Sequence, residues 1–246
     1  MRSGLARLRV TLGYALIVVT VSVAMLPPGR HDAWIRAAST NLHNLGHGRI
    51  GTLFDSAFVV DAGPVYLWLP GLVCLLGIVE LQWGGAQLLI AFAIGHLGAT
   101  LLVAAGLAAA VTWHWTSPAV THAPDVGMSY GALGVLGALT AAIPMRCRAG
   151  WVGWWLAGAA AVAAHDPDFT DIGHVVALTL GVAASLRFGT PAGWTRARLG
   201  LLAPAAVFGH LVLADSATTT VTGCAALGAA AFAVVDRRRR RPAHHL

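Results

Sequence analysis

Two polar residues that could do chemistry lie in apolar parts of the chain. Ser129 lies within the stretch 127–131, and His174 closes the stretch 171–174. A histidine near a serine hydroxyl can take its proton as a general base and make the oxygen a nucleophile. The two residues therefore predict a serine hydrolase with a Ser-His dyad, provided that the fold brings them together.

The composition places this chemistry inside a membrane. Hydrophobic residues make up 57% of the 246 residues and charged residues only 11%, and the mean hydropathy is +0.71. These values lie far outside the range of soluble domains and are typical of a multi-pass membrane protein. Crossing roughly 30 Å of hydrocarbon takes about 20 apolar residues. Eight segments approach that length: Val10 to Met25, Val59 to Val79, Ala86 to Ala110, Val126 to Ile143, Trp151 to Ala164, Ile172 to Leu186, Leu201 to Leu213 and Val221 to Val235.

The arginines predict the orientation, because they gather in the cytoplasmic loops of membrane proteins. Arginines before the first span, after the fourth, between the sixth and seventh, and at the chain end all fall on one side. Most aspartates fall on the other side, although Arg30, Arg36 and Arg49 lie there too. We expect a plasma membrane protein with both termini cytoplasmic. The net charge of +6 is then a topology signal and indicates no nucleic-acid partner.

This topology gives the two polar residues a similar depth. Ser129 comes about four residues into the fourth span and His174 about three residues into the sixth, and both spans start outside. The structural alternative is that Ser129 bonds to a carbonyl of its own helix and His174 is a packing residue. The matched depth favours the dyad.

Other features of the sequence indicate no cofactor and no metal. Cys74, Cys147 and Cys224 lack metal-ligand spacing and are predicted to be packing residues without disulfides. The histidines near the outer face are scattered, which does not favour a zinc site. The absence of lysine is typical of a GC-rich bacterial genome. The N-terminal arginines, apolar run and Ser22-Val23-Ala24 also resemble a signal peptide, which remains an alternative for the first span.

At these residues the chain resembles the rhomboid family of intramembrane serine proteases. That family has six core spans, a Gly-x-Ser motif near the outer start of the fourth, and a histidine in the sixth followed by small residues at helical spacing. The matching residues here are Gly127, Ser129, Gly134 and Gly137 in the fourth span and His174, Ala177 and Gly181 in the sixth. Small residues let membrane helices approach closely, and we expect Gly95 and Gly98 to do the same.

The resemblance extends over about residues 10 to 187. Glu80, the only glutamate, lies in a turn similar to the family's glutamate-containing turn, and residues 49–52 are similar to the stretch before its second span. The resemblance implies an all-α polytopic bundle with a rhomboid-like core at 1–190. Residues 191–246 would add two transmembrane helices and a basic cytoplasmic tail.

The chain also departs from the family pattern. The family carries a histidine and an asparagine in the second span that help to bind the oxyanion, and counting back from Glu80 puts Pro64 and Trp68 at these places. Losing one oxyanion donor costs about two to three orders of magnitude in rate. The family's aromatic residue that stacks on the histidine is replaced by Leu133. Tyr130 projects about 100° away from Ser129 on a helix, so we do not expect it to substitute for the family's stacking aromatic residue.

Several other residues could support the site. His96 in the third span, or Asn41, His43, Asn44 or His47 in the first external loop, could donate to the oxyanion, although packing and a solvated loop are simpler explanations. Gly127 would let another backbone approach Ser129. Asp171 is expected to cap the sixth helix, or otherwise to tune the pKa of His174.

Two functions from different classes remain open. The first is an intramembrane serine protease that cleaves transmembrane substrates near the outer leaflet. The second is a catalytically inactive rhomboid-fold protein that binds other membrane segments as clients. A small transporter is less favoured, because the spans show no paired mid-span acids and no inverted repeat.

Overall fold

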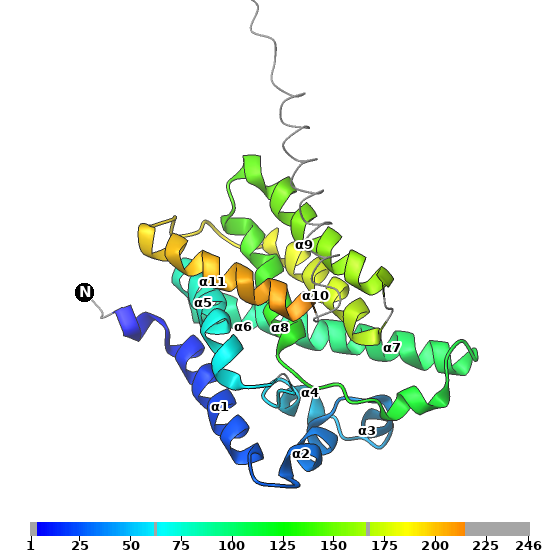
Figure 1. Ribbon diagram of the computed structural model, residues 1–246. Coiled ribbons are helices and arrows are strands. Elements are labelled where there is room, and N and C mark those ends of the chain that lie inside the picture. The colour runs from blue at the N-terminus through cyan, green and yellow to red at the C-terminus, as the bar shows by residue number, and fades with distance from the viewer. Residues whose placement is uncertain (1–3, 62, 166–167, 215–246) are drawn as a thin grey trace, which may run out of the picture.

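The computed structural model describes residues 4–61, 63–165 and 168–214, and within these ranges the chain is all-α, without strands (Figure 1). The α-helices are α1 (Arg9–Met25), α2 (Arg30–Ala38), α3 (Leu42–Gly46), α4 (Thr52–Asp55), α5 (Val65–Trp83), α6 (Gly85–Ala93), α7 (Ala99–Thr112), α8 (Ser129–Ala138), α9 (Met145–His165), α10 (Phe169–Ser185) and α11 (Arg196–Leu213). Short 3-10 turns lie at η1 (Gly4–Arg7), η3 (Pro118–His122) and η4 (Leu139–Ala142), and a π-helical turn, η2 (Ile94–Gly98), joins α6 to α7.

The long helices coincide with the predicted spans. Three helical stretches are long and apolar enough to cross a bilayer: Val65–Trp83, Gly85–Thr112 and Arg196–Leu213. Shorter apolar helices occupy the predicted first, fourth and sixth spans, and α9 occupies the fifth. The predicted eighth span, Val221 to Val235, lies outside the described residues. The apolar helices support a membrane protein, and the count of eight spans stays a prediction.

Two helices start later than their hydropathy suggested. The second span was expected from Val59, but α5 begins at Val65, because Gly63 has φ +67° and Pro64 is extended. The fourth was expected from Val126, but α8 begins at Ser129, because Gly127 has φ +126°. Positive φ is strained for L side chains, so glycine marks these breaks.

Glycines on three helices allow close packing around α8, which lies at the centre of the bundle and packs most extensively against α10 (Figure 1). A methyl group at Gly134 would lie 2.5 Å from the Cα of Gly95, and one at Gly181 would collide with the carbonyl oxygen of Gly134. The predicted close-packing role of these glycines is confirmed. Interhelical distance in a membrane is set by such contacts, since burial from water gives no driving force there.

Glu80 joins the end of α5 to the start of α1. Its carboxylate is buried and accepts hydrogen bonds from the Val10 N–H at 3.0 Å, the Thr11 N–H at 2.8 Å and the Thr11 hydroxyl at 2.7 Å. A negative charge at a helix N-terminus is stabilised by the free N–H groups and the helix dipole. The single glutamate therefore fixes the first two spans relative to each other.

The helix α11 packs mainly on α5. The buried Phe208 side chain lies against Gly71, where a Cβ atom would collide with it. The guanidinium of Arg198 donates to the carbonyl of Leu81 at the end of α5, at 3.1 Å. The predicted seventh span is thus packed onto the second. The predicted division of the chain near residue 190 stays a prediction.

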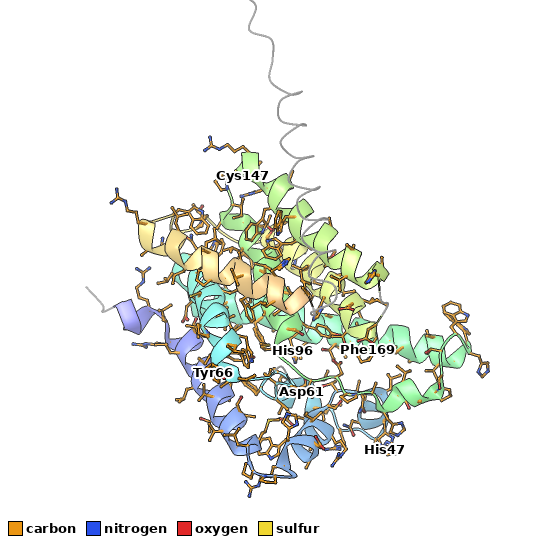
Figure 2. All side chains as sticks on the ribbon, viewed as in Figure 1. His47, Asp61, Tyr66, His96, Cys147 and Phe169 are labelled. Atoms are coloured by element: carbon orange, nitrogen blue, oxygen red, sulfur yellow. The ribbon has the colours of Figure 1, made fainter. Side chains whose placement is uncertain are left out.

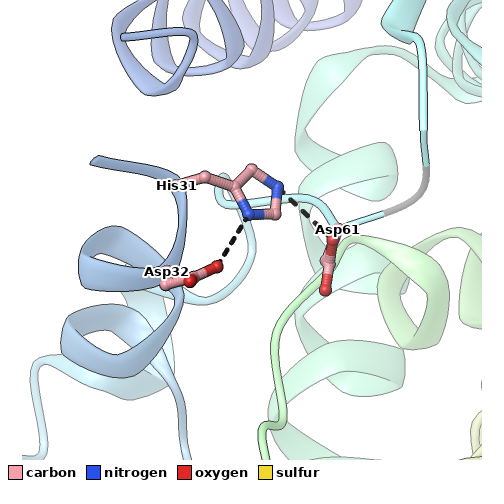
Figure 3. A network of polar contacts seen from close by, with 3 residues as sticks. All are labelled: His31, Asp32 and Asp61. Carbon is pink, nitrogen blue, oxygen red and sulfur yellow. Dashed lines mark hydrogen bonds and ion pairs between the residues drawn. The ribbon is translucent and has the colours of Figure 1, made fainter. Parts of the chain in front are cut away.

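The segments α2, α3 and α4, which follow α1 and precede α5 in the chain, gather at one end of the molecule (Figure 1). His31 on α2 lies between two carboxylates, with Nδ1 3.4 Å from Asp32 and Nε2 3.4 Å from Asp61 (Figure 3). Asp61 belongs to the segment that leads into α5. The histidine therefore links this end segment to the chain that enters the second predicted span.

Candidate active site

Ser129 is the first residue of α8, half-buried, and its position is set by the backbone before it. Gly127 donates its N–H to the carbonyl of Ser56 at 2.8 Å. Met128 at the N-cap makes no side-chain hydrogen bond to the helix. The first N–H groups of an α-helix have no partner within the helix. The Ser129 side chain thus lies beside the first backbone N–H groups of α8, which have no acceptor within the helix.

His174 lies in α10 and is buried. Its Nδ1 atom is 3.6 Å from Oδ1 of Asp171, one turn earlier. The expectation that Asp171 caps this helix was wrong: the N-cap is Asp168, whose carboxylate accepts from the Phe169 N–H at 2.7 Å. The helix begins three residues before the apolar run, which leaves Asp171 in its first turn, facing His174.

Tyr130 packs on His174, with 5.6 Å between the ring centroids and 82° between the ring planes. Gly173 makes room, because a Cβ atom there would collide with the tyrosine ring. The expectation that Tyr130 could not substitute for the family's stacking aromatic was wrong. The Tyr130 side chain points away from Ser129, and on that side of α8 it meets α10. Leu133, the residue at the family's aromatic position, is buried in the hydrophobic core.

The structure does not place Ser129 and His174 in a hydrogen bond. Both ring nitrogens of His174 are buried without a hydrogen-bond partner among the described residues. Ser129 instead lines a small cavity of about 30 Å³ that Ser56, His96 and Asp125 also line. A cavity of this volume has room for about one water molecule.

His96 lies in the interior of the bundle, in the π-helical turn η2 (Figure 2). Its Nε2 atom is 3.1 Å from the carbonyl oxygen of Leu53 and 3.2 Å from the Ser56 hydroxyl. Because a carbonyl only accepts, we assign the hydrogen to Nε2, which leaves a lone pair on Nδ1. Nδ1 is buried without a partner among the described residues. In this tautomer Nδ1 is the acceptor atom of His96, and Nδ1 would donate to an oxyanion only if the ring were protonated.

Asp125 is the ionisable carboxyl group on the same cavity. Its backbone is fixed, since its N–H donates to the Ser39 hydroxyl at 2.8 Å and its carbonyl accepts from Thr40 at 2.9 Å. Burial, and then repulsion from Asp168, raise the pKa of Asp125 to about 7. The residue was not among the sequence candidates, because nothing in its local sequence signals burial.

The predicted loop donors lie elsewhere. Asn44 is buried, and its amide donates to the carbonyls of Arg36 at 3.2 Å and Ser39 at 2.7 Å. Asn41 caps α3 by accepting from the Asn44 N–H at 2.9 Å. Neither amide lines the cavity beside Ser129, and nor do His43 and His47. These residues organise the end segment of the molecule.

Trp68 on α5 stands at one of the two places where the resemblance expects oxyanion donors. Its indole is buried, and its Nε1–H has no hydrogen-bond partner within the described part of the chain. A buried N–H without a partner costs free energy. Trp68 therefore has an unused N–H donor at this place. Pro64, at the other place, has no N–H.

A larger cavity lies between α9 and α11, away from these residues. It has a volume of about 920 Å³ and is apolar, with Trp151, Trp154, Trp155 and Trp194 in its lining. It begins near Ile143 and Pro144, beyond the end of α8 opposite Ser129. Across the described residues, no group of three or more His, Cys, Asp or Glu side chains is arranged to hold a metal ion. Cys74 and Cys147 are free thiols, and Cys224 lies outside the described residues.

Fold and site together define an all-α membrane protein in which the fourth and sixth predicted spans pack through glycines and carry a serine and a histidine. The family model described as "Rhomboid-like protein" matches residues 10–189. The chain belongs to the rhomboid-like protein family, which confirms the resemblance. No curated protein and no solved structure matches the chain.

Proposed function

We propose that this protein is an intramembrane serine protease in which Ser129 is the nucleophile and His174 is the general base. The observation that carries the proposal is the packing of Tyr130, the residue after Ser129, on the ring of His174. This contact ties the start of α8 to the histidine. Family membership supports the same assignment.

In the proposed reaction, Ser129 Oγ attacks the carbonyl carbon of a peptide bond in a transmembrane substrate, and His174 takes the hydroxyl proton. The proton passes to the leaving amine, and water then hydrolyses the acyl-enzyme and regenerates the serine. The 3.6 Å approach of Asp171 to Nδ1 leaves Nε2 as the basic atom for Ser129. Catalytic hydrogen bonds are often long before substrate binds, so the separation of serine and histidine is compatible with this role.

The oxyanion needs donors, and the chain offers two kinds. The open N–H groups at the start of α8 point along the helix axis, where the helix dipole also favours negative charge. The unpartnered indole N–H of Trp68 is the side-chain donor that we assign to this task. We assign His96 to hold the deacylating water through its Nδ1 lone pair.

Labelling with a serine-directed fluorophosphonate tests the dyad. We expect labelling of the full-length protein in membranes and a loss of about a thousandfold or more in Ser129→Ala and His174→Gln. Ser185→Ala, at the other end of α10, is the matched control and should label normally. Labelling that persists in Ser129→Ala would exclude the dyad. No labelling of any folded variant or of the wild type would favour the inactive, client-binding alternative.

The proposed orientation puts both termini in the cytoplasm of the cell and Ser129 near the outer leaflet of the plasma membrane. Met145 and Ile50 are exposed and lie on opposite predicted sides. In a cysteine-free background, an impermeant maleimide added to intact cells should label Ile50→Cys and not Met145→Cys. The reverse pattern would overturn the orientation.

A further inference from the structure

A second cavity, of about 310 Å³, lies in the segment formed by α2, α3 and the turn η3, apart from Ser129. This volume is at the lower end of the range for small-ligand sites. Cationic and hydrogen-bonding side chains line it: Arg36, Ser39, Asn41, His43, Arg49 and His122. We call it the arginine cavity. His47, next to it, lies at the end of the molecule opposite Cys147 (Figure 2).

Within the described part of the chain, no negative side chain compensates the charges of the arginine cavity. No carboxylate of the described residues lines it. Arg49 is held by neutral acceptors, since it donates to Oδ1 of Asn44 at 3.0 Å and to the carbonyl of Ala37 at 2.9 Å. Arg36 makes no side-chain hydrogen bond or ion pair with a described residue. Two guanidinium groups therefore face one hollow with no carboxylate of the described residues between them.

Two histidine rings also line the cavity. The rings of His43 and His122 stack, with 4.4 Å between centroids and 30° between planes. Desolvation, and then the positive neighbours His47, His122 and Arg49, lower the pKa of His43. A bound anion would relieve the repulsion within this group.

The cavity is also built in advance of any ligand. Asn44, which is 4% exposed, ties Arg49 to the carbonyls of Arg36 and Ser39. Asn41 reaches the carbonyl of His122 at 3.5 Å and links α3 to η3. The guanidinium of Arg49, held in place by these contacts, loses little freedom when it binds an anion.

We propose that the arginine cavity is a binding site for a phosphate group, either free or carried by a phospholipid headgroup. Guanidinium groups match the geometry of phosphate oxygens and bind them through paired, charge-assisted hydrogen bonds. Beside Arg49, the apolar side chains of Ile50 and Phe54 are 68% and 63% exposed. Such side chains suit contact with acyl chains, and clustered cations at that level suit the headgroups of anionic lipids.

Two binding measurements on the full-length protein test this site. The first is calorimetric titration of inorganic phosphate in a nonionic detergent at constant ionic strength. The second is native mass spectrometry of protein released from nanodiscs of phosphatidylglycerol and phosphatidylcholine, which reports retained phosphatidylglycerol. Binding in both arms indicates recognition of the phosphate group itself, and retention of the lipid alone indicates a headgroup site.

Arg36→Gln is the informative variant, because the Arg36 side chain makes no hydrogen bond or ion pair with a described residue. We expect it to weaken binding in the responsive arm roughly tenfold or more. Arg30→Gln removes the same charge from the same helix without touching the cavity, and should change binding less than about twofold. Arg49→Gln should weaken binding as Arg36→Gln does. Equal effects of Arg30→Gln and Arg36→Gln, or no binding in either arm, would overturn the proposal.

Discussion

Tyr130 on α8 packs its ring edge-to-face with that of His174 on α10, at a centroid distance of 5.6 Å. Aromatic pairs of this geometry contribute about 0.5–1.5 kcal/mol beyond the burial of their surface. Neither ring nitrogen of His174 has a hydrogen-bond partner among the described residues, and Asp171 approaches Nδ1 only to 3.6 Å, so the tyrosine contact is the main one that orients the imidazole. Gly173 is required for it, because any side chain there would displace the tyrosine.

Replacing Tyr130 should separate the role of its ring from that of its hydroxyl. We expect the free energy of unfolding of Tyr130→Phe to lie within about 1 kcal/mol of the wild-type value, because the ring contact remains. This variant should also be labelled at a similar rate. Tyr130→Ala should lose about 3–5 kcal/mol and most of its fluorophosphonate labelling. The free energy of unfolding is measured by titration with sodium dodecyl sulfate. The labelling rate is measured at detergent concentrations below those that unfold the protein. Wild-type labelling by folded Tyr130→Ala would show that His174 needs no orienting ring.

Trp68→Phe tests the proposed oxyanion donor, because it removes the indole N–H and keeps an aromatic ring in the core. Loss of one such donor lowers the rate about 100- to 1000-fold. We expect the rate of peptide-bond cleavage or of labelling to fall by that order while the protein stays folded. Trp155→Phe, another buried tryptophan with an unpartnered Nε1–H, is the control and should label normally. Equal rates in the two variants would make Trp68 a packing residue.

Gly134 and Gly106 form a matched pair for helix packing. A Cβ atom at Gly134 would lie 2.5 Å from Gly95 Cα, whereas one at Gly106 on α7 meets nothing within 4 Å. Gly134→Ala should therefore destabilise the fold by about 1–3 kcal/mol through overpacking. Gly106→Ala should be neutral or stabilising by up to about 1 kcal/mol, since alanine favours the helix. The measurement is the free energy of unfolding of each variant in detergent. An unchanged value for Gly134→Ala would contradict the packing argument.

We expect the stability of the protein to depend on pH through Asp125, because burial raises the pKa of this carboxyl group from 3.8 to about 7. Between about pH 4 and 7 the unfolded chain loses this proton while the folded protein keeps it. Stability from this group is thus complete below about pH 4 and declines as the pH rises to about 7. The difference in unfolding free energy between the wild type and Asp125→Asn should fall over that range, on the order of 2–4 kcal/mol. A difference that stays constant or rises with pH would contradict the burial of this carboxyl.

Much of the fold could be predicted because it depends on local properties of the chain. Apolar length marks the spans, and Gly134 and Gly181 mark where helices touch, since only small residues permit that distance. The ends of helices were less predictable. Hydropathy alone extends the fourth span to Val126, while the dihedral angle of Gly127 starts α8 at Ser129.

Contacts between side chains of different helices depend on how each helix is rotated about its axis, and the sequence does not state that rotation. The sequence by itself determined a membrane protein of the rhomboid-like family, with a serine and a histidine at the starts of two spans. Only the tertiary structure placed Tyr130 on His174, Asp171 beside that ring, and His96 across a cavity from Ser129. It also gathered Arg36 and Arg49 around one hollow, because such neighbours are set by packing between segments far apart in the chain.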